Sequence, residues 1–135
     1  MTTQTFHGSC HCGRVRFACD LDPSLPTSRC NCSICTKLRL WKAFVPGAAL
    51  RLLEGADELS QYRFNSGRVE HAFCRNCGIK PFGHGPKGAF PDEFWAVNIA
   101  CLDDMDDATK GALPVVWQDG RHDDWEHAPA QVASL

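Results

Sequence analysis

Hydrophobic and polar residues alternate along several short segments of the chain. In residues 14–19, Val15, Phe17 and Cys19 alternate with Arg14, Arg16 and Ala18. This period of two is typical of a β-strand with one buried face. By the same criterion, or as short apolar runs, strands are predicted at residues 41–45, 50–53, 61–64, 69–73, 94–102 and 115–117.

Helix signals are few. Residues 33–40 and 103–111 each suit one or two helical turns. Between the predicted strands, residues 80–91 hold three glycines and three prolines, which predict an irregular loop there. The pattern therefore predicts a mainly β protein with small antiparallel sheets and few short helices. A length of 135 residues suits a single domain spanning residues 1–135.

Nine cysteines are the main departure from ordinary composition. The N-terminal segment has neither the basic start nor the apolar core of a signal peptide, and no apolar run approaches the roughly 20 residues of a membrane span. We therefore expect a cytoplasmic protein that does not span a membrane. Because the cytosol keeps thiols reduced, the cysteines predict metal ligation rather than disulfides.

Charge is distributed unevenly along the chain. The formal net charge is −2, but residues 1–91 carry 12 basic and 6 acidic side chains, and residues 92–135 carry 2 and 10. Thiolates bound to zinc would make the total more negative. This balance argues against a nucleic acid as the partner.

Two cysteine pairs that lie far apart in the sequence have the spacing of a structural zinc site. A C-x-C pair in an extended segment places both thiols on one side, with His11 pointing away. A C-x-x-C turn brings two further sulfurs to one point, and a glycine follows each pair. Together the pairs predict a closed tetrahedral four-thiolate site. Its ligands are Cys10, Cys12, Cys74 and Cys77.

A third group, Cys30, Cys32 and Cys35, offers three thiols within six residues. Three ligands leave the fourth zinc position for water, a substrate, Cys19, Cys101 or a histidine. An open position is typical of a catalytic zinc, so we expect the reactive site here. The alternative is a second closed structural site with a distant fourth ligand.

The ligand set also limits the reaction. Three thiolates leave the zinc unit with a net charge of −1, which disfavours the formation of hydroxide and suits the binding of another thiolate. We therefore expect a small thiol as the substrate. Basic residues near the cysteines could receive its carboxylates, or could offset the negative zinc–thiolate centres. They are Arg14, Arg16, Arg29, Lys37, Arg39, Lys42, Arg68, Arg75 and Lys80.

The three clusters also have a recognisable order. The segments G-S-C-H-C-G (8–13), R-C-N-C-S-I-C (29–35), F-C-R-N-C-G (73–78) and V-N-I-A-C-L-D-D (97–104) resemble the glutathione-dependent formaldehyde-activating enzyme family, which includes the centromere protein V domain. The resemblance implies a β-tent fold clipped together by two zinc ions. It implies structural zinc at Cys10, Cys12, Cys74 and Cys77, and active-site zinc at Cys30, Cys32 and Cys35.

The activity implied by this resemblance is the addition of glutathione to formaldehyde, which gives S-hydroxymethylglutathione and is classed as a carbon–sulfur lyase reaction. The partners would then be a small-molecule thiol and an aldehyde. Two other functions fit the same cysteines. One is a zinc-stabilised binding module without turnover, and the other is a thiol redox or metal sensor.

Several single residues have two interpretations. Cys19 and Cys101 fall on the apolar faces of predicted strands and are expected to be buried core thiols rather than ligands. His84 could shuttle protons or lie at the surface. Trp41 and Phe44 follow the three-cysteine segment closely and could line its pocket.

Overall fold

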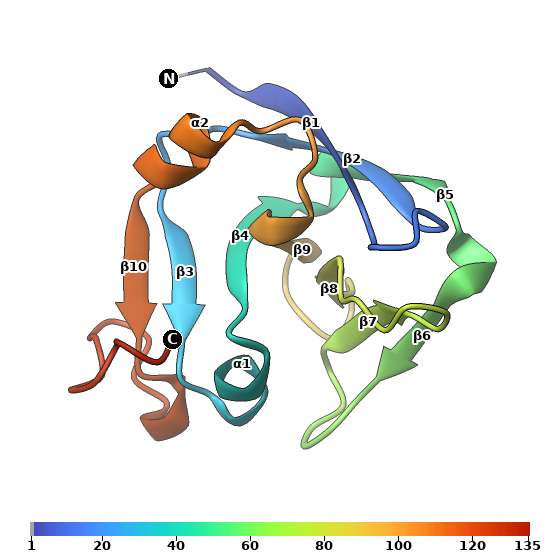
Figure 1. Cartoon of the computed structure of the whole chain (residues 1–135). Coiled ribbons are helices and arrows are strands. Elements are labelled where there is room, and N and C mark those ends of the chain that lie inside the picture. The colour runs from blue at the N-terminus through green and yellow to red at the C-terminus, as the bar shows by residue number, and fades with distance from the viewer. Residues whose placement is uncertain (1) are drawn as a thin grey trace.

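The computed structural model describes residues 2–135, which form two β-sheets (Figure 1). The smaller sheet is antiparallel, with the strand order β1–β2–β5. Its strands are β1 (Gln4–Ser9), β2 (Arg16–Leu21) and β5 (Leu50–Glu54). In Figure 1 this sheet lies across one end of the larger one.

The larger sheet has seven strands in the order β10–β3–β4–β9–β8–β7–β6. All its neighbours are antiparallel except β3 and β10, which are parallel although they lie far apart in the sequence. Its strands are β3 (Thr27–Cys30), β4 (Trp41–Pro46), β6 (Leu59–Tyr62), β7 (Glu70–Cys74), β8 (Phe82–Gly85), β9 (Phe94–Asn98) and β10 (Val115–Gln118).

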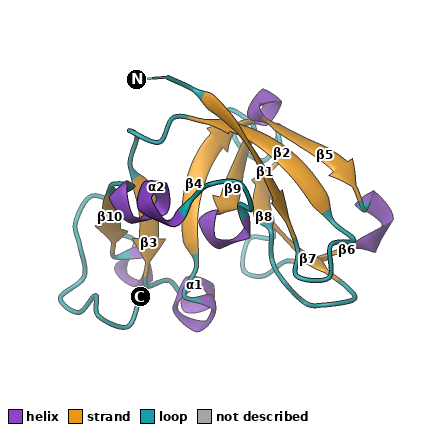
Figure 2. Ribbon diagram, turned by 45° about the horizontal axis from the view of Figure 1, so that its top comes forward, coloured by secondary structure: helices purple, strands orange, loops and turns teal. Residues whose placement is uncertain are grey.

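Helices are short and connect the strands (Figure 2). The two α-helices are α1 (Ser33–Leu38) and α2 (Asp107–Ala112), and the 3-10 turns are η1 (Gly47–Ala49), η2 (Ala56–Glu58), η3 (Ile99–Cys101) and η4 (Gly120–His122). Within residues 2–135, none of them has the length and apolarity that crossing a membrane requires. The prediction of a mainly β fold with few short helices is confirmed.

The core lies between the two sheets. Phe17 of β2 is fully buried and meets Phe82 of β8 edge to face, with 5.5 Å between the ring centres. Val97 of β9 and Ile99 are also fully buried in the same cluster. Apolar burial of this kind is the main favourable contribution to folding. It fixes the smaller sheet, and with it the β1–β2 turn, against the larger sheet.

The strand predictions differ from the structure at several places. β1 and β3 were not predicted, and the strand expected at 14–19 begins at Arg16. The prediction of an irregular 80–91 loop is wrong because β8 lies within it, paired on both sides. Prolines flank this strand rather than interrupt it. The strand expected at 94–102 ends at Asn98, whose side chain accepts a hydrogen bond from the Ala100 N–H and caps η3.

Candidate functional site

The four-cysteine cluster joins the smaller sheet to the larger one. Cys10 and Cys12 lie in the turn between β1 and β2, Cys74 ends β7, and Cys77 lies in the turn that follows. Their four sulfur atoms lie within 4.8 Å of one another. The expected extended conformation at residues 10–12 is corrected: the segment is a turn, closed by the Gly13 N–H donating to the Cys10 carbonyl.

The spacing of these sulfurs fits a metal ion. The Cys12 Sγ lies 3.6 Å from the Cys10 Sγ and 3.7 Å from the Cys74 Sγ. A tetrahedral zinc with Zn–S bonds of about 2.3 Å places its sulfurs about 3.8 Å apart. The Val15 N–H also donates to the Cys10 Sγ at 3.3 Å, as expected for a ligand that carries negative charge. The cluster can therefore hold zinc with all four positions filled by the protein.

Glycine has a defined role after each cysteine pair. Gly13 and Gly78 both have a φ of +80°, a conformation that side chains with a Cβ rarely adopt. The Gly78 N–H donates to the Cys74 carbonyl at 2.7 Å, which closes the C-x-x-C turn. The glycine that follows each pair in the sequence is therefore required by the backbone conformation of the turn.

The three-cysteine cluster lies where β3 passes into α1. Cys30 ends β3, Cys32 immediately precedes α1, and Cys35 is within the helix. Their sulfurs also lie within 4.8 Å of one another, and the Cys30 and Cys32 Sγ atoms are 3.5 Å apart. This spacing again fits the sulfur–sulfur edge of a zinc tetrahedron.

A buried lysine compensates the charge of this cluster. Lys42 of β4 is only 6 % exposed, and its Nζ donates to the Cys30 Sγ at 3.5 Å and the Cys35 Sγ at 3.6 Å. Pairing of β3 with β4 places it there, because Lys42 lies opposite Ser28. Three thiolates and a zinc ion carry a net charge of −1, which one ammonium group neutralises.

Among residues 2–135, no fourth cysteine, histidine or carboxylate joins the three-cysteine cluster. Cys19 and Cys101 lie in the main hydrophobic core, and burial raises the pKa of each thiol to about 12. Their interpretation as core thiols is confirmed. The fourth metal position is therefore open to a ligand from outside the chain.

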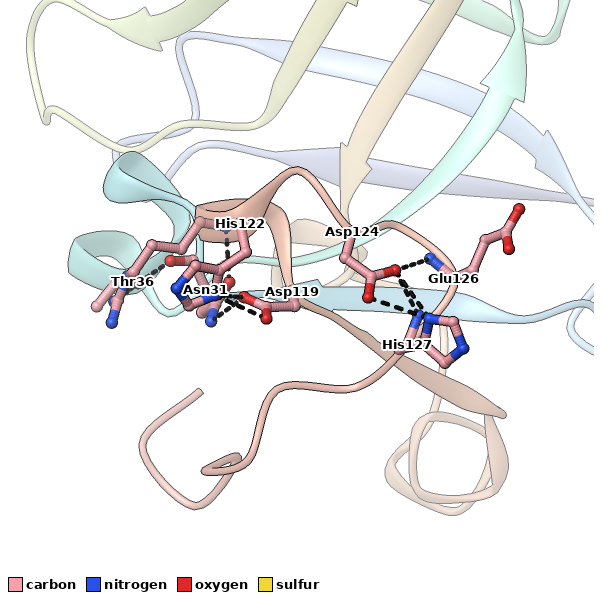
Figure 3. Close-up of polar contacts among 8 residues, drawn as sticks. Asn31, Thr36, Asp119, His122, Asp124, Glu126 and His127 are labelled. Carbon is pink, nitrogen blue, oxygen red and sulfur yellow. Dashed lines mark hydrogen bonds and ion pairs between the residues drawn. The ribbon is translucent and has the colours of Figure 1, made fainter.

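The C-terminal part of the chain holds the three-cysteine segment in place (Figure 3). The Asn31 side chain donates to Asp119 at 2.9 Å, and its Oδ1 accepts from the Arg121 N–H at 3.0 Å. Arg121 in turn donates to the Thr36 hydroxyl at 3.2 Å. Hydrogen bonds from Asn31 and His122 lower the pKa of Asp119. Asp119-Gly120 signalled only a turn in the sequence, so this contact was missed.

Gly120 allows this segment to approach the cysteines closely. A Cβ at this position would lie 2.6 Å from the Trp125 ring and 3.2 Å from the Cys32 Cβ. A larger residue would therefore displace the tryptophan or the cysteine segment. Residues 119–125, which we name the C-terminal strap, thus pack directly on the three-cysteine cluster.

A pocket of about 460 Å³ opens over the three-cysteine cluster, and none of the four cysteines of the other cluster lines it. Phe44 lines it as expected, whereas Trp41 does not and instead donates to the Thr27 hydroxyl at 2.8 Å. The remaining walls come from the connection between β6 and β7, from the strands β7, β8 and β9, and from the strap. The charged lining residues are all basic: Lys42, Lys80 and Arg121. The aromatic ones are Phe44, Phe64, Phe94 and Trp125.

Two further ionisable groups line the pocket. The sequence indicated Lys80 only as one of nine basic residues near the cysteines, and it gave His71 no role in the site. Lys80 is 8 % exposed, and burial lowers the pKa of its ammonium group to about 8. Its Nζ lies 2.5 Å from the Nδ1 of His71. Burial, and then the charge of Lys80, lower the pKa of His71 to about 4. The burial of Lys80 could not be predicted from the sequence, because it depends on β8, which was itself not predicted. A lysine in the sequence indicates only a positive charge.

His84 lies apart from this arrangement. It is not among the residues lining the pocket and is held between two carboxylates, Glu70 at 2.5 Å and Glu93 at 2.7 Å. Its ring stacks on Trp95 at 4.0 Å between centres. The structure thus gives His84 a role in joining β7, β8 and the segment before β9.

Comparisons with known proteins agree with the geometry. A family model described as glutathione-dependent formaldehyde-activating enzyme matches residues 5–119. Among solved structures, a Rhodobacter sphaeroides protein is similar to this chain at 32 % sequence identity and a TM-score of 0.68. The similarity covers 82 % of this chain and 99 % of that one.

Proposed function

The chain belongs to the glutathione-dependent formaldehyde-activating enzyme family, and from that premise we propose that it is a zinc-dependent enzyme of the carbon–sulfur lyase type. It adds a small thiol, with glutathione as the first candidate, to formaldehyde or a similar small aldehyde. In this proposal Cys30, Cys32 and Cys35 hold the catalytic zinc. The four-cysteine cluster holds a second, structural zinc, and residues 1–135 act as one domain.

One observation carries the proposal: the two cysteine clusters differ in access. The four-cysteine cluster is complete by itself, whereas the three-cysteine cluster lies against a pocket and lacks a fourth protein ligand among the described residues. A structural zinc site is closed, and a catalytic one keeps a position for substrate. When bound, zinc would supply a soft Lewis acid that holds a substrate thiol in its anionic form.

The surrounding residues support an anionic thiol. Lys42 offsets the charge of the cysteine thiolates, so a further negative sulfur can enter with less repulsion. Arg121 adds a further positive charge to the pocket, and no carboxylate lines it. Cationic groups with few competing anions favour carboxylates such as those of glutathione. The aromatic walls would exclude water from the reacting carbon and oxygen.

The reaction needs two groups brought together and one proton moved. The thiolate sulfur attacks the aldehyde carbon, the carbon–oxygen double bond opens, and the resulting alkoxide accepts a proton. A pocket that holds thiol and aldehyde side by side makes the bond-forming step effectively unimolecular. The residues of the chain therefore contribute binding, orientation and charge compensation.

Exchange NMR with glutathione and formaldehyde tests this function. Protein loaded with zinc should speed the exchange between free glutathione and S-hydroxymethylglutathione, and the Cys32→Ser variant should not. Both proteins should contain the zinc of the four-cysteine site, which separates loss of catalysis from loss of folding. A zinc-loaded wild type that leaves the exchange rate unchanged would refute this substrate pair.

The same measurements distinguish the other candidate functions. A binding module without turnover would keep two zinc ions and give no acceleration. A redox sensor would release zinc reversibly on mild oxidation. A cytoplasmic location belongs to the proposal as well, and it is supported by nine cysteines that are all free of disulfides. The acidic surplus of residues 92–135 supports a small-molecule partner rather than a nucleic acid.

A further inference from the structure

The proposed reaction leaves one chemical task without a residue, which is the transfer of the proton. A thiol loses a proton before it attacks, and the alkoxide gains one afterwards. General acid–base catalysis requires a group within hydrogen-bond reach whose pKa is close to the working pH. Of the ionisable groups that line the pocket, the cysteines and Lys42 are engaged with one another.

Lys80 shares the pocket in which this proton must move. It lines the same pocket as the three-cysteine cluster, next to Gly83 of β8, and its side chain is almost entirely buried. Gly83 lies directly beside the ammonium group, because a Cβ added there would be in van der Waals contact with the Nζ at 3.8 Å. A buried amine that faces a ligand pocket can exchange protons with the ligand rather than with bulk water.

Lys80 also lacks the partner that would fix its charge. None of the ion pairs found in residues 2–135 includes Lys80. In the described part of the chain, the hydrogen-bonded neighbour of its Nζ is His71, whose low pKa leaves the ring neutral at pH 7. The His71 Nδ1 can therefore accept a hydrogen bond from the ammonium without holding it in the charged form as a carboxylate would.

We propose, on the basis of the function above, that Lys80 is the proton carrier of the addition, with His71 as its positioning residue. The neutral amine takes the proton that the thiol loses, which gives a thiolate and an ammonium group. The thiolate forms the carbon–sulfur bond, and the ammonium returns the proton to the alkoxide. The amine is regenerated, and the balance is one thiol and one aldehyde consumed for one hydroxymethyl thioether formed.

The electrostatic surroundings allow both forms of Lys80. Burial favours the neutral amine, and the nearby Lys42 of β4 adds to this effect. Cys35 and Cys32, at α1, favour the ammonium, and His71 of β7 accepts its hydrogen bond. With a pKa of about 8, both forms are present near neutral pH, which is the condition for a group that alternately accepts and donates.

The mechanism requires that the substrate thiol and Lys80 together carry one proton, so that one of the two groups is protonated and the other is not. The rate should therefore fall at low pH, where both are protonated, and at high pH, where both have lost their protons. This gives a bell-shaped pH profile. A lysine that acted only as a fixed positive charge would not require the amine form, and arginine could replace it.

The test measures zinc-loaded wild type, Lys80→Met and Lys80→Arg by exchange NMR from pH 6 to pH 9.5. Both variants should lose about 10²–10⁴-fold in the rate at saturating glutathione, with little change in the half-saturating concentration. Lys87→Met, which removes an exposed lysine outside the pocket, is the matched control and should keep the wild-type profile. Zinc content and circular dichroism verify that each variant is folded.

The outcomes separate this inference from the function on which it rests. Two results would refute the role of Lys80 as proton carrier and leave the enzyme function intact. One is a Lys80→Arg variant as active as the wild type, and the other is a Lys80→Met variant whose rate still falls at high pH. A wild type without acceleration overturns both. Should Lys80→Met fail to fold, competitive acetylation of the wild type decides: the pKa of Lys80 must lie well below the usual 10.5 of a lysine, and an unshifted pKa refutes the proposal.

Discussion

The two cysteine clusters should contribute very unequally to stability, and a paired substitution can show it. We consider Cys12→Ser combined with Cys77→Ser, which takes one thiolate from each half of the four-cysteine site. These two side chains are the less buried members, whereas Cys10 and Cys74 are 2 % and 0 % exposed. The double variant therefore removes metal ligands while leaving the buried cysteines packed.

The structure gives the size of the effect. A metal ion held by these cysteines would link Cys12 to Cys74 across a sequence separation of 62 residues, and a cross-link that closes such a loop stabilises a fold by about 4 kcal/mol through chain entropy alone. Cys30 to Cys35 closes a loop of only a few residues, for which the same relation gives about 2 kcal/mol. A domain of this size has about 5–15 kcal/mol in total, so loss of the long-range link removes a large share.

Urea unfolding followed by tryptophan fluorescence, at fixed free zinc, measures both effects. The double variant should lose at least about 4 kcal/mol and one zinc, and much of it should be unfolded at 37 °C. Cys32→Ser should also lose one zinc but remain folded. If the double variant stays within about 1 kcal/mol of wild type, or if Cys32→Ser unfolds first, the structural assignment of the four-cysteine site is refuted.

Three other substitutions test the pocket. Lys80→Met should stabilise the fold. The pKa of Lys80 falls from 10.5 to about 8 on folding, so burying the charged lysine costs the folded state about 3 kcal/mol below pH 8. The stability advantage of the variant should shrink between pH 8 and 10.5, which urea unfolding at a series of pH values would show. Lys42→Met should lower zinc affinity at the three-cysteine cluster about 10–100-fold in a chelator competition, whereas Lys37→Met should not. Gly120→Ala should cost about 1–3 kcal/mol and shift Trp125 fluorescence, while Gly111→Ala, where a Cβ meets no atom within 4 Å, should cost nothing.

The sequence indicated the cysteine sites better than the strands because ligand spacing is local. The pairs at Cys10 and Cys74 each have a glycine at positive φ one residue beyond, and that arrangement is set within a few residues. β8 was missed for the opposite reason. Its pairing with β7 and β9, not its own composition of Phe, Gly and His, makes residues 82–85 a strand.

Pocket residues were predicted least well, since their roles depend on contacts distant in sequence. In the sequence Lys80 is indistinguishable from any surface lysine. Only the pairing of β8 places it beside His71 and away from water. Asn31 and Arg121 are 90 residues apart, and no pattern in either segment indicates their hydrogen bond. Phe44 was anticipated because it follows the three-cysteine segment closely along β4.

The parallel pairing of β3 with β10 has a consequence for the order in which a ribosome can complete the molecule. Residues 27–30 leave the ribosome well before their partners at 115–118 and the strap at 119–125, which are made only after Cys77. Both ligand pairs of the four-cysteine site are already available once Cys77 has emerged. Because folding can begin during synthesis, we expect a first zinc to be captured once Cys77 has emerged, and the thiols of residues 30–35 to stay unsupported until the strap has followed.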